Sequence, residues 1–333
     1  MHWDRGFGTQ TTVFRRLLCA CLLMMALMLA AMASETVRFA PKFSLGETLR
    51  YRIESRTNTT GRTTTPIANP EGGSKSSQVI RMLVRLDVLD VGHPTAAIAG
   101  EVRLRATYEQ SSAKTEGDAF DPAASSLSEQ YARIEGRSIE FTIEPRGQLA
   151  EFHGLEDVFP DRSAAPPVLS WLSGFSSGSG FPPNGVAIGQ KWKNERPVPG
   201  APLLGLTWRT ESSYLRNEKC NSSGGASASG SRAGTSSGDC AVILTRFEIF
   251  RRGSTGANAT PEDYLRNGLR TSGTWTGSGE SLDSMSLASG LVVSSTQTSK
   301  QDMDYVITSA TTGSTIHHVG QVQSQTQITL LLN

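Results

Sequence analysis

Residues 80–89 read Ile-Arg-Met-Leu-Val-Arg-Leu-Asp-Val-Leu, with apolar residues at every even position and mostly polar residues at the odd ones. Side chains of a β-strand point alternately to its two faces, so this pattern predicts a strand with one buried and one wet face. The same two-residue period recurs at 102–108 and 139–143. Sheets with one solvated face are usually antiparallel, and we expect these segments to pair in that way.

Strand-like patterns continue through the second half of the chain. They lie at 206–208, 241–250, 271–277, 291–298, 304–311 and 320–332. The exception is 154–175, where apolar residues follow helix-like spacing that is interrupted by prolines. We therefore predict a mainly β fold of ten or more strands, with one or two short helices near the middle of the chain.

Two pairs of similar segments predict an internal duplication. Residues 45–49 resemble 188–192, and the hairpin around Gly147 resembles the one around Gly290, both at an offset of 143 residues. Each pair has a physical reading, because the first is a turn glycine before a strand and the second a hairpin glycine. A change of composition toward Ser, Gly and Pro separates the two copies. The expected units are 1–33 (signal peptide), 34–153 (first repeat), 154–185 (helical, Pro/Gly/Ser-rich linker) and 186–333 (second repeat).

The N-terminal segment has the composition of an export signal. Arg15 and Arg16 precede an apolar run at 17–33 that ends in Ala-Met-Ala, so cleavage is expected after Ala33. Retention as a membrane anchor is the alternative, because 17 apolar residues reach the lower limit for a bilayer span. A lipid-anchor box ending at Cys21 is excluded, because only four residues separate that cysteine from Arg16. We expect a periplasmic or extracellular protein.

Charge and sequence motifs argue against binding of nucleic acid or nucleotide, and the cysteines predict a disulfide. The chain has 32 Lys and Arg against 31 Asp and Glu, a balance that offers no general attraction for nucleic acid. No glycine-rich phosphate loop lies between a strand and a helix, which argues against a nucleotide site. Cys220 and Cys240 bracket a stretch rich in Ser, Gly and Ala, and a disulfide between them would close a flexible loop and contribute about 3 kcal/mol.

The layout resembles a group of uncharacterised exported bacterial proteins. The resemblance lies in the signal segment, in Phe43-Ser-Leu-Gly-Glu-Thr-Leu-Arg-Tyr51 and in Phe181-Pro-Pro-Asn-Gly-Val-Ala-Ile-Gly-Gln-Lys-Trp192. It implies two tandem antiparallel curved sheets or half-barrels, similar in outline to periplasmic lipoprotein carriers. The resemblance assigns no catalytic residue to this chain.

The sequence contains short matches to catalytic and metal-binding motifs, but each match lacks residues or structural context that the motif requires. Gly-x-Ser-x-Gly occurs around Ser176 and Ser236, but neither site has both the preceding strand and the following helix that a nucleophile elbow needs. Ser-x-x-Lys at 111–114 lacks its partner motifs and is expected in a loop. His317 and His318 are adjacent on a predicted strand and point to opposite faces, so they do not share a metal. We expect no cofactor, no metal and no catalytic residue, and an envelope hydrolase is the weakest alternative.

Two groups of charged residues are candidates for ligand binding. Arginines on the polar phase of the first-half strands could pave a face for carboxylate or phosphate, unless acidic residues such as Asp87 and Glu140 pair with them. Asp302 and Asp304 share a strand face but lack the further ligands that calcium needs, so a solvated face is expected.

The function predicted from these patterns is ligand binding at the cell envelope. A concave sheet face could hold a lipid or other apolar molecule, unless helices cover that face and its residues form an ordinary core. The residues expected to line the groove are Met82, Val84, Leu104, Tyr108, Phe141, Trp208, Phe247 and Trp275. The alternative is a structural or interaction module that pairs with an envelope protein through an exposed edge, for which the strand at 322–328 is the candidate.

Overall fold

The computed structural model describes residues 36–64, 73–92, 100–117, 122–144, 149–158, 171–172, 180–198, 201–220, 238–252 and 260–331. The expected signal peptide lies outside these residues. The strands are β1 (Thr48–Thr64), β2 (Ser74–Val91), β3 (Val102–Gly117), β4 (Ser138–Ile143), β5 (Leu149–His153), β6 (Lys191–Pro197), β7 (Leu206–Lys219), β8 (Asp239–Arg251), β9 (Leu269–Ser286), β10 (Val292–Ser309) and β11 (Thr315–Leu331). The helices are α2 (Pro122–Ile134), α3 (Leu155–Val158) and α5 (Glu262–Arg266).

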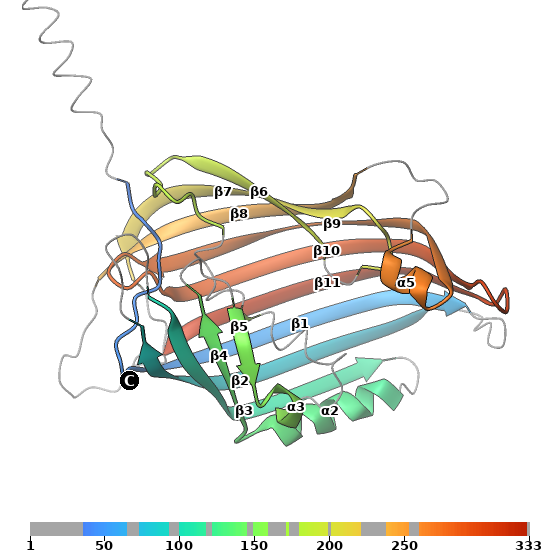
Figure 1. Ribbon diagram of the computed structural model, residues 1–333, viewed down its shortest axis with the longest axis horizontal. Helices are drawn as coiled ribbons and strands as arrows, with labels where there is room; N and C mark the ends of the chain where they lie inside the picture. The colour runs from blue at the N-terminus through green and yellow to red at the C-terminus, as the bar shows by residue number, and fades with distance from the viewer. Residues whose placement is uncertain are drawn as a thin grey trace, which may run out of the picture.

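All eleven strands belong to one antiparallel sheet, which confirms the mainly β fold class (Figure 1). The order across the sheet is β5-β4-β3-β2-β1-β11-β10-β9-β8-β7-β6. The two expected sheets are joined into one because β11 pairs with β1 on one side, from Arg50 opposite Leu331 to Thr64 opposite His317, and with β10 on the other. β5 and β6 form the two free edges, so the sheet is open. The strand expected at an edge, 322–328, lies within β11 in the middle of the sheet, and that prediction is wrong.

The two-residue period assigns one face of the sheet to the core, as predicted. Tyr51 and Ile53 of β1 lie opposite Val84 and Met82 of β2, and all four side chains are buried. Their neighbours in sequence, such as Arg81, lie on the outer face. Residues 111–114 belong to β3, contrary to the loop expected there, and the pattern places Ser111 and Lys114 on opposite faces.

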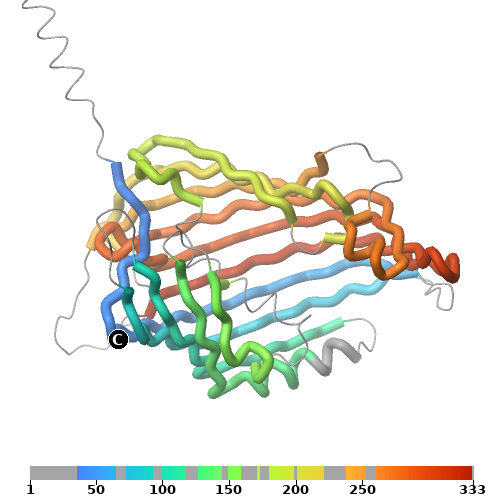
Figure 2. The backbone as a smooth tube through the Cα atoms, in the orientation of Figure 1, coloured from blue at the N-terminus to red at the C-terminus, as the bar shows by residue number. Residues whose placement is uncertain are grey.

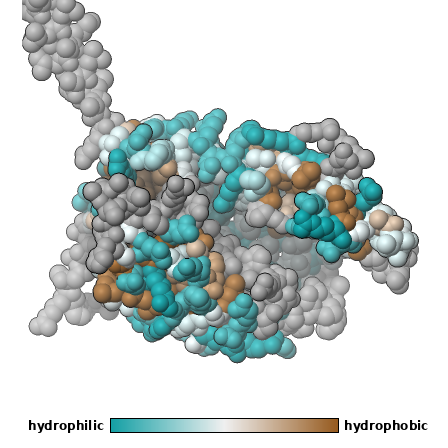
Figure 3. Space-filling view, viewed as in Figure 1, coloured by the Kyte–Doolittle hydropathy of each residue, from teal (hydrophilic) through white to brown (hydrophobic). Residues whose placement is uncertain are grey.

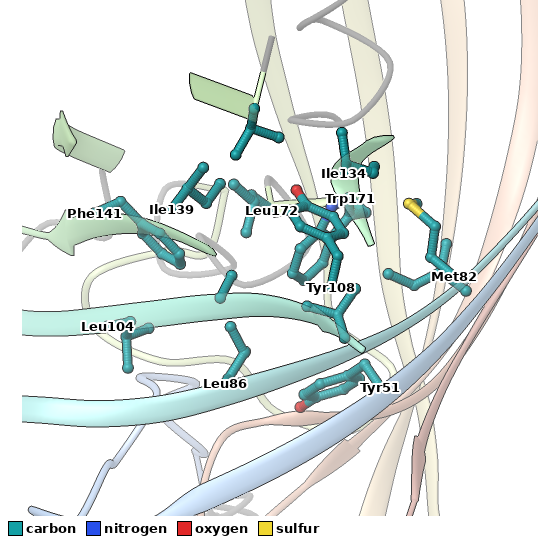
Figure 4. Packing of buried hydrophobic residues seen from close by; sticks show 14 of the residues in the cluster. Tyr51, Met82, Leu86, Leu104, Tyr108, Ile134, Ile139, Phe141, Trp171 and Leu172 are labelled. Carbon is teal, nitrogen blue, oxygen red and sulfur yellow. The ribbon is translucent and has the colours of Figure 1, made fainter. Parts of the chain in front are cut away.

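Helices cover the first half of the core face. α2 was not expected, although Leu127, Tyr131 and Ile134 have the spacing of a helix that packs along one face. α3 lies in the segment where a short helix was predicted, and its Val158 is buried. Together with Trp171 and Leu172, these helices and β1–β4 enclose the first core (Figure 4).

Two smaller cores lie on the same face in the second half. The second core contains Phe39, Val186, Tyr214, Ala241, Ile243, Met285 and Val292. The third core contains Ala201, Leu203, Leu206 and Ile249, with Trp208, Trp275 and Tyr305 packed against it. The core face of the second half is therefore filled in patches rather than continuously.

A segment at 36–47 crosses the ends of the long strands (Figure 2). Val37 forms an isolated bridge with Val186, and the backbone N–H of Lys42 donates to the carbonyl of Ser289 at 2.7 Å. Phe39 is 4% exposed and contacts the rings of Phe181 and Tyr214. This crossing segment closes one end of the second core.

The two turns that predicted a duplication have the same local structure. Gly46 and Gly189 have φ of 77° and 83°, a region that only glycine enters without strain. In the first turn the backbone N–H of Ser44 donates to the Glu47 carboxylate at 2.9 Å. In the second turn the backbone N–H of Ala187 donates to the side-chain oxygen of Gln190, also at 2.9 Å. These matches agree with a duplication, which stays a prediction together with the domain boundaries; Gly147 of the second pair lies outside the described residues.

The predicted disulfide is present between Cys220 and Cys240, with Cα atoms 5.0 Å apart. Cys240 is on β8 and fully buried, and Cys220 directly follows β7. Such a bond is compatible with an oxidising location outside the cytoplasm. Within the described ranges, no helix has the length and apolar character needed to cross a membrane.

Candidate functional site

The core face of the second half contains a cavity of about 270 Å³. Its lining comes from β6 to β11 together with Trp171, Gly180 and Phe181. Six flat strands would span about 24 Å at the usual strand spacing, so a cavity of this size touches all of them only because the sheet curls. In the space-filling view, hydrophobic side chains form separate groups on this side of the molecule, with polar residues between them (Figure 3).

Aromatic rings form the walls of this aromatic cavity. Trp208 of β7 stacks on Phe247 of β8 with ring centroids 4.6 Å apart, and Phe181 meets Trp192 of β6 at 5.4 Å. The guanidinium of Arg196 lies over Trp208 at 5.7 Å. Apolar side chains also line it, namely Ile243, Met285, Val292 and Ile328. Polar side chains make up the rest of the lining, namely Asn194, Thr210, Ser212, Thr245, Ser281, Asp283, Ser295 and Gln297. The arrangement offers flat apolar surfaces that suit rings or hydrocarbon chains.

A glycine makes room for the ring of Phe247. Gly279 of β9 lies directly opposite Phe247 in the ladder, and a side chain at Gly279 would collide with that ring. Phe247 can therefore lie against the backbone of the sheet and leave the space above it free. This is the packing by which an aromatic residue covers a glycine in the neighbouring strand.

One carboxyl group lies in the wall of the cavity. Asp283 of β9 accepts hydrogen bonds from the hydroxyls of Ser295 at 2.6 Å and Ser281 at 3.0 Å. Burial raises the pKa of Asp283, and the two serine hydroxyls oppose that rise by stabilising the charged form. Among the described side chains, no Lys, Arg or His forms an ion pair with it.

The residues predicted to line a groove divide between two environments. The five from the first half are at most 5% exposed and belong to the first core, so helices and Trp171 plug that face; they are Met82, Val84, Leu104, Tyr108 and Phe141. Trp208 and Phe247 line the aromatic cavity. Trp275 lies beside the third core, stacked on Tyr305 at 6.4 Å, and its indole N–H donates to Gln301 at 3.2 Å. Of the eight, two therefore line the aromatic cavity and five lie together in the first core.

Sequence reasoning missed several residues of the cavity. Phe181 and Trp192 begin and end the second segment on which the resemblance rests, and the sequence there indicates only a turn and a strand. Asp283 follows a stretch of β9 that is rich in Ser and Gly. Every second residue from Thr271 onward lies on the same face of the strand, and counting along β9 in this way places Asp283 on the core face. The two-residue period does locate Asp283 on the correct face, but it does not show that the face is hollow there.

The other surface features have structural roles. The outer face of the first half is neutralised by ion pairs, with Glu140 between Arg103 and Arg105, and Asp87 beside Arg85. His317 and His318 point to opposite faces, as predicted. His317 contacts Asp304, and His318 contacts Thr63. Asp302 lies 3.7 Å from Lys300, and no cluster of metal-ligating side chains occurs within the described residues. Ser176 and Ser236 lie outside those residues.

Comparisons with known proteins give little further information. No family model and no curated protein matches the chain. Among solved structures, the chain is similar to a lipovitellin structure that is described as showing lipid-protein interactions in lipovitellin. The TM-score is 0.43 and the sequence identity is 12%. The match covers 87% of this chain and 25% of that chain, so the protein spans about a quarter of the lipovitellin chain. A similarity at this level is too low to support a shared function.

Proposed function

We propose that the protein binds an apolar or amphiphilic ligand, such as a lipid, in the aromatic cavity. The observation that carries this proposal is the hollow between Trp208, Phe247 and Trp192, on the same sheet face that the first core fills in the first half. Ligand sites are concave and mostly apolar, with a few polar groups that fix orientation. Asp283 and the hydroxyls beside it supply those groups here. The volume of about 270 Å³ suits a small ligand or one segment of a larger amphiphile.

The contrast between the two halves supports this assignment. In the first half, α2 and the pair Trp171 and Leu172 fill the core face, and the side chains beneath them are buried. In the second half the described helix, α5, has five residues, none of them buried. An unplugged curved face surrounded by aromatic rings would cost hydrophobic free energy if it stayed hydrated, and an apolar ligand recovers that cost.

We further propose that the protein works outside the cytoplasm and binds its ligand without transforming it. The N-terminal segment that resembles an export signal supports the location, and the Cys220–Cys240 disulfide is compatible with it. A signal peptide at 1–33 and two β-rich repeats at 34–153 and 186–333, joined by the linker at 154–185, remain part of this proposal. An interaction module that pairs through a sheet edge is disfavoured, because the outer strand β6 carries Lys191, Lys193 and Pro197.

The test has two parts. Native mass spectrometry of the protein purified from its own source, followed by organic extraction, should detect a retained apolar molecule. In parallel, the ligand-free protein should bind 1-octanol, measured through tryptophan fluorescence, because Trp192 and Trp208 face the cavity. Phe247→Leu should weaken octanol binding about fivefold or more, since it removes the stacked ring.

Phe250→Leu provides the matched control. Phe250 lies on the same strand but on the outer face, where it packs under the guanidinium of Arg209 at 4.1 Å. This variant loses the same ring and should leave octanol binding unchanged. An empty protein that shows no saturable octanol binding would refute the proposed function, and so would equal effects of the two substitutions.

A further inference from the structure

Asp283 differs from the carboxylates on the outer face of the sheet. Glu140 accepts from two arginines, and Glu195 from Arg209 at 2.6 Å, so each has a cationic partner. Asp283 faces the aromatic cavity between Ile243 of β8 and Ser295 of β10, and its contacts are with neutral hydroxyls. Asp283 is half-buried, and a carboxylate that loses part of its hydration without gaining a counter-ion is costly, because hydroxyl donors compensate for only part of that loss.

The aromatic walls favour positive charge at the same place. The faces of tryptophan and phenylalanine rings attract cations, most strongly when water is excluded. Trp208 already holds one cation, the guanidinium of Arg196, at the outer end of the cavity. Asp283 and Arg196 are the charged groups among the lining side chains, so the cavity carries one negative and one positive group.

We propose that the aromatic cavity recognises the organic ammonium group of its ligand, with Asp283 as the counter-ion and the aromatic rings as walls. This inference rests on the proposed function, because it names the chemical class of the same ligand. The ammonium group would lie beside Asp283, and the apolar part would lie along Phe247 and the apolar side chains. Arg196 would repel a cation at the outer end, which fixes the orientation of the ligand.

The experiment compares three probes with the same chain: octyltrimethylammonium, 1-octanol and octyl sulfate, each below its micelle concentration. The ligand-free full-length protein should bind the ammonium probe about tenfold more tightly than 1-octanol, and octyl sulfate more weakly than either. Asp283→Asn should weaken binding of the ammonium probe about tenfold more than binding of 1-octanol, so that the preference for the ammonium probe is lost. Affinity for the ammonium probe should rise with pH as Asp283 loses its proton, and octanol affinity should not.

Glu280→Gln is the matched control for charge. Glu280 is on the same strand but on the outer face, 3.8 Å from Arg246, and its substitution should leave the preference intact. Octanol binding that depends on Phe247 but shows no ammonium preference, or a preference that survives Asp283→Asn, would overturn this inference and leave the proposed function standing. Failure of all three probes to bind would overturn both.

Discussion

Substitution of Gly279 by alanine tests whether this glycine shapes the aromatic cavity. A Cβ at this position would lie 2.7 Å from Cε1 of Phe247 and would also collide with the backbone carbonyl of Thr298. Carbon atoms pack at about 3.5 Å or more, so the ring must move by roughly 1 Å and lose its stacking on Trp208. Overpacking of this kind costs about 1–3 kcal/mol. We expect Gly279→Ala to lower the free energy of unfolding by that amount and to weaken octanol binding.

Gly277→Ala is a control on the same strand and the same face. Its Cβ would lie 3.1 Å from Cγ of Gln301 and 3.1 Å from Cδ1 of Ile249, which are side-chain atoms that can move. It would also lie 3.3 Å from the backbone carbonyl oxygen of Lys300, a contact that a shift of a few tenths of an ångström relieves. We expect its unfolding free energy to change by less than about 1 kcal/mol, since a small entropic gain offsets the contact. Urea unfolding followed by tryptophan fluorescence measures both variants. Equal stabilities and equal octanol affinities would refute the proposed role of Gly279.

Three further predictions concern stability. Replacing both Cys220 and Cys240 by alanine should lower the free energy of unfolding by about 3 kcal/mol, as expected for a sequence separation of 20, and no change in urea unfolding would contradict this. Leu104→Ala, at a fully buried position, should cost about 2–5 kcal/mol in the same assay, with the half-exposed Leu204 as the control site. Burial raises the pKa of Asp283 above its value in the unfolded chain. The folded protein therefore loses stability as pH rises from the unfolded pKa through the folded pKa. Ligand-free Asp283→Asn should then be more stable than the unsubstituted protein at neutral pH. Parallel pH profiles of melting temperature would contradict it.

The strands could be predicted because alternation is a local property. Residues 80–89 and 102–108 carry it clearly, and the structure assigns them to β2 and β3 with the expected face buried. The single sheet could not be predicted in the same way. Alternation determines which face of β11 is buried, but it does not identify β1 and β10 as the neighbours, since any strand with the same pattern satisfies it.

The cavity was harder to predict for a related reason. Periodicity placed Leu104 and Phe247 on the same face without distinguishing a residue under a helix from one beside a hollow. That difference depends on α2, whose spacing at Leu127, Tyr131 and Ile134 lies in a serine-rich stretch and was missed. Asp283 was missed because a single carboxylate among serines carries no motif. Its significance comes from the aromatic rings that five other segments place around it.

The position of β11 has a consequence for the order in which the sheet assembles. Arg50 pairs with Leu331, a separation of 281 residues, and among the described strands the two halves of the ladder are joined by the pairing of β1 with β11. Until β11 docks, β1 and β10 are long unprotected edges that can pair with other chains. Pairings this distant in sequence also form slowly. A chaperone that delays aggregation during folding would therefore act on the interval before β11 inserts, and a chain truncated before Thr315 would remain in that vulnerable state.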